Sequence, residues 1–451
     1  MFLKKNIIFK VFTIFLISIS FFLGFYLREN AVGGGTEFYE LSWPIIQSFK
    51  LDFLDTLKNY GKFRDYTLPF SHILNAYINP FSNNIENFQL SITIISFGIF
   101  LIFFLVLKRT FNNINFVDTL LISSIILLLP FFRTSAFWGK NENFGWLFFI
   151  LALYFFSEIK KNISENSDKK KILNVILFCF SSACALYARQ ALIFLPISYF
   201  LYLYFNKAGK KIFLSSIISF VILAIPGFLL TWTWGNVYPS LPDGSSPHGG
   251  FFGGWIQPIH ILKNFPILLS FFGFYLIPIV FLEFLQTDLK TFFDKYLKNF
   301  IFALLIFIFL SQLNLLNYLG EYTMAGGAIL KINYLIMKNN FLLLLVFSSI
   351  GFSIIVVLFK ENFKNNAVIL LPMFIIYGSP KYLYQEYAEP LILIIFFFAL
   401  KTNLKKIYFN NISFSNFIFL SYFAIYLIGS IYFKHFAFDS YEKWIIFLNA
   451  Q

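Results

Sequence analysis

The chain has 451 residues, of which 58% are hydrophobic, 22% aromatic and only 13% charged, and its formal net charge is +13. Soluble proteins carry about 25% charged residues, so this composition excludes a soluble globular domain, and it also excludes disordered, collagen-like and disulfide-scaffold proteins. The apolar runs are continuous rather than alternating, which excludes a porin-type barrel. The sequence therefore predicts an all-α, polytopic integral membrane protein.

About thirteen apolar runs predict membrane-spanning helices, each of which takes about 20 residues, or fewer where neighbours bury it. In chain order they cover residues 7–27, 88–107, 117–132, 144–157, 172–187, 191–205, 212–234, 266–285, 300–319, 340–359, 366–379, 388–400 and 412–433. Several are short, so the predicted number holds to within one or two. The first run follows Lys4 and Lys5 and lacks a small-residue cleavage site, which indicates a retained helix rather than a removed signal peptide.

The basic residues favour one orientation of these spans. With the N-terminus in the cytoplasm, the cytoplasmic side holds 21 of the 35 Lys and Arg residues and the outer side holds 14. Cytoplasmic loops carry the excess of positive charge, so we expect the N-terminus inside and, for an odd number of spans, the C-terminus outside. The expected location is an inner (plasma) membrane. No basic patch interleaved with aromatic residues indicates a nucleic-acid partner.

Two of the predicted outer loops are long, residues 28–87 and 235–264, whereas the cytoplasmic connections are short. The spans themselves carry almost no charge, although transporters usually place polar and charged groups within their spans. We therefore expect any chemistry on the outer face. Cys179 and Cys184 lie in one apolar run and are expected to be core residues, and no metal-ligand spacing predicts a metal site.

Two short stretches of the first outer loop carry acidic residues. Glu37 and Glu40 lie in the run from Gly33 to Pro44, and Asp65 lies in the run from Phe63 to His72. An acidic residue just beyond the first span, on the outer side, resembles the pattern of the GT-C membrane glycosyltransferases. Within that class the chain looks most like the alpha-1,2-glucosyltransferase family that adds the terminal glucose to the dolichol-linked oligosaccharide.

Positions in the first outer loop are similar to that family's motifs and follow the same order. Glu37 stands at the Glu of an Asp-Glu pair in which Thr36 replaces the Asp, and Gln47 matches a Gln of the following helix. Asp65, with a Thr and a Pro shortly after it, resembles a Trp-Asp element followed by Thr and Pro. Because Thr36 replaces an acid, the resemblance leaves open whether Glu37 or Asp65 is the base.

Three later stretches also resemble elements of the family. Arg189 and Gln190 match the start of an Arg-Gln-Thr-Asn element, although its Thr and Asn are not kept. The stretch Asp243–His248, followed by Gln257, resembles a Gly-Asp-Lys-Ser-x-His element, and Lys381 opens a segment that resembles Arg-Tyr-Tyr. The resemblance thus covers most of the chain in order, through short motifs.

The resemblance implies one GT-C-like transmembrane domain over residues 1–451 that transfers a hexose, with inversion, from a polyprenyl-phosphate donor. The expected acceptor is a lipid-linked or surface glycan, and neither a nucleotide sugar nor a cofactor is implied. The implied catalytic residues are Glu37 and Asp65. The implied substrate-binding residues are Glu40, Gln47, Arg189, Gln190, Asp243, His248, Gln257 and Lys381.

The chemistry of such a transfer calls for the same residue types. A carboxylate must deprotonate the acceptor hydroxyl, a cation or donor array must take the developing phosphate charge, and a groove must admit the polyprenyl chain. The candidate bases are Glu37, Glu40 and Asp65. The candidate phosphate ligands are Arg189, Arg133, Lys381 and His248.

Structural interpretations compete with these roles. Glu37 and Glu40 can favour a helix start, and Asp65 can pair with a cation or cap a helix. Arg189 can extend to the membrane interface, and His248 can belong to a Gly-rich loop that either closes over substrate or has no role. For Trp232, Trp234 and Trp255 the interpretation we prefer is an interfacial belt.

Two further functions stay open. A polysaccharide polymerase or ligase also has many spans and a large outer loop, but such enzymes rely on Arg and His in later outer loops. A lipid-linked oligosaccharide flippase would need charged residues that line a central cavity, and the spans carry few charges. A glycosyltransferase should instead bring Glu37, Asp65 and Arg189 together on the outer face.

Overall fold

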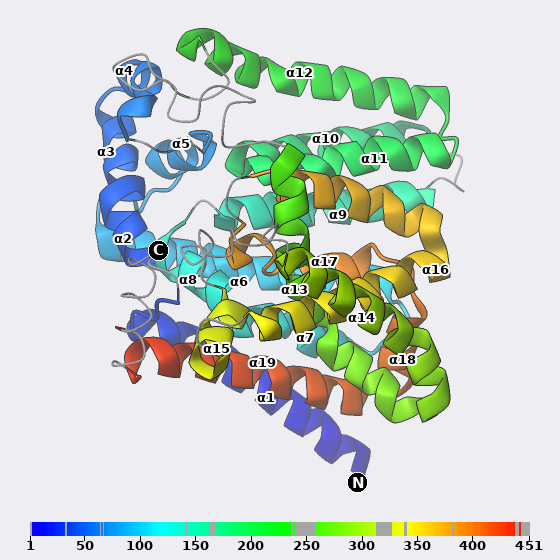
Figure 1. The fold of residues 1–451 in the computed structure, drawn as a ribbon. Helices are drawn as coiled ribbons and strands as arrows, with labels where there is room; N and C mark the ends of the chain where they lie inside the picture. The colour runs from blue at the N-terminus through cyan, green and yellow to red at the C-terminus, as the bar shows by residue number, and fades with distance from the viewer. Residues whose placement is uncertain are drawn as a thin grey trace. The chain divides into compact units, whose positions relative to one another are not determined.

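The computed structural model describes residues 2–31, 34–63, 65, 67–140, 142–162, 168–235, 239, 258–312, 327–337, 341–380, 383–437 and 442. Every regular element in these ranges is a helix (Figure 1). The helices form two compact units: unit 1 comprises Met1–Leu127 and Phe132–Trp255, and unit 2 comprises Leu128–Phe131 and Ile256–Gln451. That residues 1–451 act as one functional domain stays a prediction.

Eight helices in the described part of the chain are long and apolar enough to cross a membrane, or up to ten if each of two bent helix pairs is one span. The eight are Ile7–Tyr26, Ile85–Thr110, Glu142–Lys160, Lys170–Ala188, Lys210–Trp234, His260–Gln286, Leu342–Gly378 and Ile412–His435. The bent pairs are Phe116–Leu128 with Pro130–Trp138 and Gln385–Phe398 with Asn403–Asn410. The predicted all-α polytopic class is confirmed to this extent, and the number thirteen stays a prediction.

Unit 1 contains twelve α-helices among the described residues. They are α1 (Phe2–Tyr26), α2 (Gly34–Glu37), α3 (Trp43–Leu51), α4 (Phe53–Lys58), α5 (Phe70–Tyr77), α6 (Ile85–Thr110), α7 (Phe116–Ser123), α8 (Pro130–Trp138), α9 (Glu142–Asn162), α10 (Asp168–Ala188), α11 (Phe194–Phe205) and α12 (Lys210–Trp234). A π-helix, Phe38–Ser42, joins α2 to α3, and 3-10 helices cover Tyr60–Phe63, Ser124–Leu128 and Gln190–Ile193.

The stretch predicted as a long first outer loop is largely helical, because α2 to α5 lie within it. Local capping explains two of the helix starts: the side chain of Asp52 accepts a hydrogen bond from the Asp55 N–H before α4, and that of Asn84 accepts from Glu86 and Asn87 before α6. Such caps satisfy N–H groups that a helix start leaves without an intrahelical partner. The placement of this stretch outside the membrane stays a prediction.

In unit 1, α10 packs against both α9 and α12, and α9 also packs against α6. Tyr187, near the end of α10, inserts its hydroxyl into the backbone of α12 beside Pro226. It donates to the Leu223 carbonyl (2.7 Å) and accepts from the Gly227 N–H (3.0 Å). An inserted hydroxyl replaces a helical hydrogen bond, so this contact fixes α12 relative to the end of α10, where Arg189 follows.

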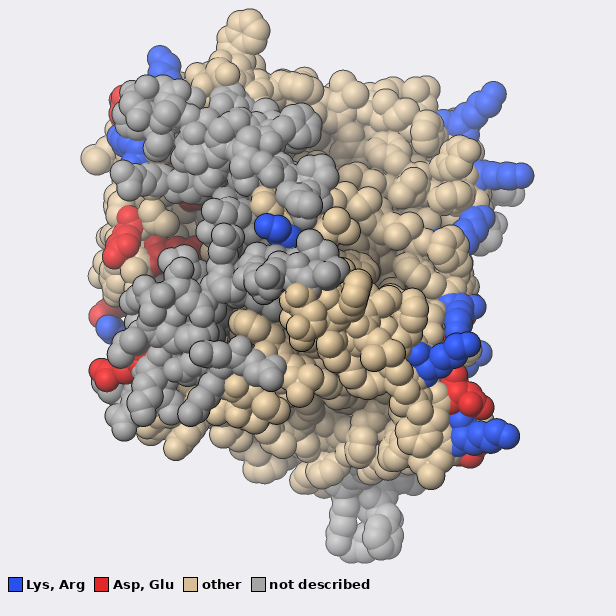
Figure 2. Space-filling view, viewed as in Figure 1, with Lys and Arg blue, Asp and Glu red and all other residues tan. Residues whose placement is uncertain are grey.

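Basic side chains gather at one end of unit 1. Figure 2 shows Lys and Arg along the edge of the surface where α12 begins. Lys160 lies in the last turn of α9, Lys170 and Lys171 lie in the first turn of α10, Lys207 shortly precedes α12, and Lys210 begins it. The clustering agrees with the charge asymmetry from which the orientation was predicted.

Unit 2 contains seven α-helices among the described residues. They are α13 (Pro258–Gln286), α14 (Leu289–Gln312), α15 (Ala328–Met337), α16 (Leu342–Gly378), α17 (Leu391–Phe398), α18 (Asn403–Asn410) and α19 (Ile412–His435), with a 3-10 helix over Gln385–Tyr387. α16 is two helices joined at Asn362, whose backbone is not helical.

Both halves of α16 pack along the same stretch of α13. In the first half, the Ser348 hydroxyl donates to the Pro266 carbonyl (2.7 Å), and Gly351 lies so close that a Cβ would approach the Leu269 carbonyl oxygen to 1.8 Å. In the second half, Asn264 donates to the Gly378 carbonyl (2.7 Å). Because Ser348 and Gly378 are thirty residues apart in sequence, the chain must reverse at Asn362. The halves correspond to the predicted spans 340–359 and 366–379.

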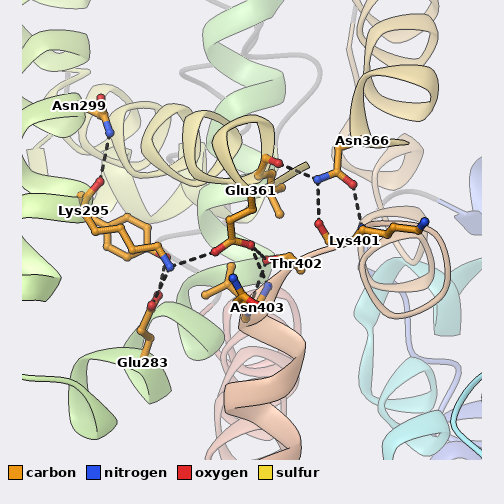
Figure 3. Close-up of polar contacts among 11 residues, drawn as sticks. Glu283, Lys295, Asn299, Glu361, Asn366, Lys401, Thr402 and Asn403 are labelled. Atoms are coloured by element: carbon orange, nitrogen blue, oxygen red, sulfur yellow. Dashed lines mark hydrogen bonds and ion pairs between the residues drawn. The ribbon is translucent and has the colours of Figure 1, made fainter. Parts of the chain in front are cut away.

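Polar side chains hold this reversal (Figure 3). Lys295 of α14 lies 2.7 Å from the Glu283 carboxylate of α13 and 3.3 Å from that of Glu361, just before the reversal. Glu361 also accepts hydrogen bonds from the Thr402 hydroxyl (2.6 Å) and the Asn403 N–H (2.8 Å) at the start of α18. This network therefore joins four helices of unit 2 at one end.

Candidate active site

The position of Glu37 depends on two glycines of α2. A Cβ at Gly34 would approach Thr134 Cγ2 to 2.7 Å, and one at Gly35 would approach the Trp138 ring to 3.2 Å. Gly34 and Gly35 are helical and permit close packing against α8, and Gly33 lies outside the described residues. This packing brings the end of α2 alongside the residues that follow α8.

Lys140 follows α8 through a turn that requires glycine. Gly139 has a φ of +65°, which favours glycine, and a Cβ there would also lie 2.6 Å from the Phe88 ring. The Lys140 Nζ lies 2.8 Å from Glu37 Oε2. The Lys140 side chain is 3% exposed and that of Glu37 is 42% exposed. Glu37 therefore reaches the surface while it pairs with a buried ammonium group.

Glu142 begins α9, where the helix dipole favours a carboxylate. Its carboxylate is attracted by the charges of Lys140 and Arg189 and repelled by that of Asp65. Its Oε2 atom is buried and has no hydrogen-bond partner among the residues described. Glu142 therefore interacts electrostatically with two cations and retains an oxygen that can accept a further hydrogen bond.

Arg189 follows α10 in an extended conformation and packs against the start of α9. Its guanidinium lies over the Trp146 ring, 5.0 Å from the centroid, and a Cβ at Gly145 would lie only 3.2 Å from Arg189 Cβ. Arg189 is 6% exposed. The interpretation that this side chain extends to the membrane interface is therefore not supported, because it is buried against Trp146.

Asp65 is held by hydrogen bonds to both of its oxygens. Oδ1 accepts from the backbone N–H and the hydroxyl of Thr67 (both 2.8 Å), and Oδ2 accepts from the Tyr60 hydroxyl (3.1 Å) and lies 2.9 Å from His72 Nε2. Burial raises the pKa of the Asp65 carboxyl, but the hydrogen bond and charge of His72 and the bonds from Thr67 outweigh it and place the pKa below its usual value.

These contacts connect three of the predicted residues. Glu37 pairs with Lys140, and Glu142 interacts with Lys140, Arg189 and Asp65. We call these residues, together with His72, the acid–base cluster of unit 1. The structure therefore brings Glu37, Asp65 and Arg189 into one electrostatic network.

The other predicted site residues are not joined to this cluster by the described contacts. Glu40 is exposed on the π-helix, and the Gln47 amide donates to the Ser82 carbonyl (3.0 Å), which gives it a structural role. Gln190 opens the 3-10 helix after Arg189. The remaining predictions, Asp243, His248, Gln257 and Lys381, lie outside the described residues.

Two side chains considered at the sequence level have structural partners. Arg133, a candidate phosphate ligand, is buried and donates to both carboxylate oxygens of Glu29 and to the carbonyls of Ser20 and Leu127. Trp234, predicted in an interfacial belt, is buried: its indole N–H donates to the Leu57 carbonyl (2.8 Å) and its ring stacks on that of Tyr60. Trp232 is exposed, and Trp255 lies outside the described residues.

Sequence reasoning missed His72, Lys140 and Glu142. His72 ends the stretch that contains Asp65, and a carboxylate seven residues before a histidine gives no spacing signal. Lys140 and Glu142 lie in a short connection predicted on the same side as Glu37. Opposite charges in connections on one side of the membrane were the signal that could have indicated them.

Comparison of the chain with protein-family models, with curated proteins and with solved structures gives no significant match. No group of three or more His, Cys, Asp and Glu side chains that could hold a metal ion occurs in the described part of the chain. What the acid–base cluster offers chemically is a partly exposed carboxylate, two buried cations and a hydrogen-bonded Asp–His pair. These are groups for proton transfer beside an anion.

Proposed function

We propose that the protein is a membrane glycosyltransferase that transfers a hexose from a polyprenyl-phosphate donor to a lipid-linked or surface glycan on the outer face. The observation that carries the proposal is the acid–base cluster, in which Glu142 interacts with the cations Lys140 and Arg189. The cluster also contains the carboxylates of Glu37 and Asp65. The sequence resemblance, which uses Glu37, Asp65 and Arg189, supports the same residues independently of this geometry.

Glu37 is the proposed general base. A base must present an oxygen to the acceptor hydroxyl, and Glu37 is the carboxylate of the cluster that reaches the surface. Both Asp65 oxygens already accept hydrogen bonds and its pKa is lowered, so it takes up a proton less readily. Asp65 is instead a positioning residue that holds the segment between Tyr60 and His72.

Arg189 and Lys140 are the proposed ligands of the donor phosphate. In the transfer, the acceptor oxygen attacks the anomeric carbon and its proton passes to Glu37. The bond between that carbon and the phosphate oxygen breaks, and the phosphate leaves with the electron pair. Fixed cations stabilise this developing charge, and an arginine can bind two phosphate oxygens at once. Attack opposite the leaving phosphate inverts the anomeric configuration.

Replacement of Arg189 tests the leaving-group role. With the purified full-length protein in nanodiscs and labelled undecaprenyl-phosphate sugars, Arg189→Ala should lose turnover strongly. Arg189→Lys should retain part of it, because lysine keeps the charge but not the bidentate geometry. The matched control is Arg109→Ala, which breaks the ion pair of Arg109 with Glu158 at the ends of α6 and α9. Wild-type turnover by Arg189→Ala would contradict the proposal.

The position of the site on the outer face is tested by reporter fusions. Fusions after Arg109, Lys171 and Lys211 should report the cytoplasm, because positive charge marks cytoplasmic connections. A fusion within residues 236–262 should report the outside. A cytoplasmic signal from that stretch would overturn the proposed placement of the site.

A further inference from the structure

α5 carries a polar face that is buried. Ser71, His72 and Asn75 are each 1% exposed or less. Positions i, i+1 and i+4 of a helix lie on one side of it, so the three side chains share a face although the helix has only eight residues. His72 on this face bonds Asp65 of the acid–base cluster.

Two oxygens on this face have no hydrogen-bond partner among the described residues. Ser71 Oγ and Asn75 Oδ1 are buried and make no hydrogen bond among the described residues, and the same holds for Glu142 Oε2 nearby in the cluster. Buried polar atoms without a partner destabilise a fold, and nearly all of them in native proteins bind protein, ordered water or ligand. Two such atoms on one face of α5, and a third in the cluster to which His72 of that face belongs, indicate that a bound group completes their hydrogen bonds.

The chemistry of the three atoms limits what that group can be. A carboxylate oxygen and an amide oxygen only accept hydrogen bonds, and a serine hydroxyl accepts as well as donates. The bound group must therefore present several O–H or N–H donors. The hydroxyls of a sugar meet this requirement, whereas a phosphate diester presents only acceptors and a polyprenyl chain presents neither.

The start of α5 lies next to the proposed phosphate ligand. The Phe70 ring lies 6.2 Å from the ring of Tyr187, which is two residues before Arg189, and 5.9 Å from that of Phe148 in α9. In a polyprenyl-phosphate sugar the phosphate is bonded directly to the transferred sugar. A sugar whose phosphate binds Arg189 therefore falls close to the start of α5.

We propose that Ser71 and Asn75 form the subsite that binds hydroxyl groups of the transferred sugar in the donor. This inference rests on the proposed function, because it takes the phosphate position from Arg189. It adds a specificity determinant: these residues distinguish the glycosylated lipid from the bare lipid phosphate.

The test measures the preference of the full-length protein in nanodiscs for undecaprenyl-phosphate glucose, galactose or mannose over undecaprenyl phosphate. Wild type should bind at least one glycosylated lipid more tightly. Ser71→Ala and Asn75→Leu should each reduce that preference about three- to tenfold, the effect of one hydrogen bond, without changing the affinity for the bare lipid. Ser96→Ala, which alters a buried hydroxyl bonded within its own helix, is the matched control.

A second readout separates a binding role from a structural one. Because Ser71 Oγ and Asn75 Oδ1 have no partner in the part of the chain that the structure describes, Ser71→Ala and Asn75→Leu should not lower the unfolding temperature. Asn79→Leu should lower it, since the Asn79 side chain bonds Ser91 and the Phe81 N–H.

Two results would overturn the subsite: an unchanged preference in both variants, or a wild type that binds no glycosylated lipid more tightly than the bare one. Bare-lipid affinity that is insensitive to Arg189→Ala would instead contradict the proposed function, so the two failures are distinguishable.

Discussion

A polar cluster of unit 2 and the acid–base cluster of unit 1 differ in whether their hydrogen bonds are complete among the described residues. In unit 2, Glu389 accepts from the hydroxyls of Tyr275 (2.5 Å) and Tyr426 (3.1 Å) and from the Phe131 N–H (2.8 Å). The Gln385 amide donates to both tyrosine oxygens and accepts from the Ala328 N–H. Donors and acceptors are matched throughout this cluster.

The acid–base cluster of unit 1 is organised differently. Glu142 Oε2 and, on neighbouring α5, Ser71 Oγ and Asn75 Oδ1 have no partner among the described residues, and Glu37 is partly exposed. A fully bonded polar network rigidifies a fold, whereas an incomplete one is retained when a ligand completes it. The unit 2 cluster is therefore complete among the described residues, whereas that of unit 1 retains acceptors, as the proposed binding and proton transfer require.

The largest expected effect separates the two carboxylates of unit 1. Glu37→Gln keeps size and hydrogen bonding but cannot take a proton, so turnover should fall about 10²–10⁴-fold without loss of protein from the membrane or of donor binding. Asp65→Asn should weaken substrate binding more than the chemical step. Glu86→Gln, at an exposed acid that begins α6, is the control.

The outcome of this pair decides the assignment of the base. If Glu37→Gln is fully active and Asp65→Asn is inactive with donor binding intact, the two roles must be exchanged. If both variants are active, the acid–base cluster does not perform glycosyl transfer, and the proposed function is contradicted.

The next effect concerns stability and compares one substitution in each cluster. Glu389→Leu leaves the hydroxyls of Tyr275 and Tyr426 and the Phe131 N–H without their acceptor. Each buried polar group without a partner costs about 1–3 kcal/mol, so the free energy of unfolding should fall by at least about 3 kcal/mol. Asn75→Leu removes an oxygen that has no partner among the residues described and should cause no such loss. Equal stability of the two variants in denaturant unfolding would remove the distinction between the clusters.

The sequence predicts much of the fold because continuous apolar runs are local signals. The runs 340–359 and 366–379 correspond to the two halves of α16, and the polar stretch between them contains the reversal at Asn362. The helices α2 to α5 were not predicted as such, because each is short and none arises from a long apolar run.

The site was predictable only in part, for a physical reason. Glu37, Asp65 and Arg189 lie in motifs and could be proposed one by one. Their connection depends on Lys140 and Glu142, which approach them through a glycine turn at Gly139 and the close packing of α2 on α8. Contacts of this kind join segments about 100 residues apart, and they cannot be predicted from hydrophobic periodicity or from the spacing of residues in a motif.

The smallest expected effect is the dependence of stability on pH that Asp65 contributes. Its pKa in the folded protein lies below its usual value, which is about 3.9 in unfolded chains. A carboxyl with a lowered pKa stabilises the fold above the unfolded pKa, and this contribution is lost as the pH falls through the folded pKa. Below about pH 4, wild type should therefore lose stability relative to Asp65→Asn, which cannot titrate. Thr67→Val removes one of the hydrogen bonds that lower the pKa, so its curve should lie between the two.

Unfolding temperatures measured from pH 3 to pH 7 test this order. A constant difference between wild type and Asp65→Asn over that range would mean that Asp65 is not held as an ionised partner of His72. The positioning role given to it beside Glu37 would then fail.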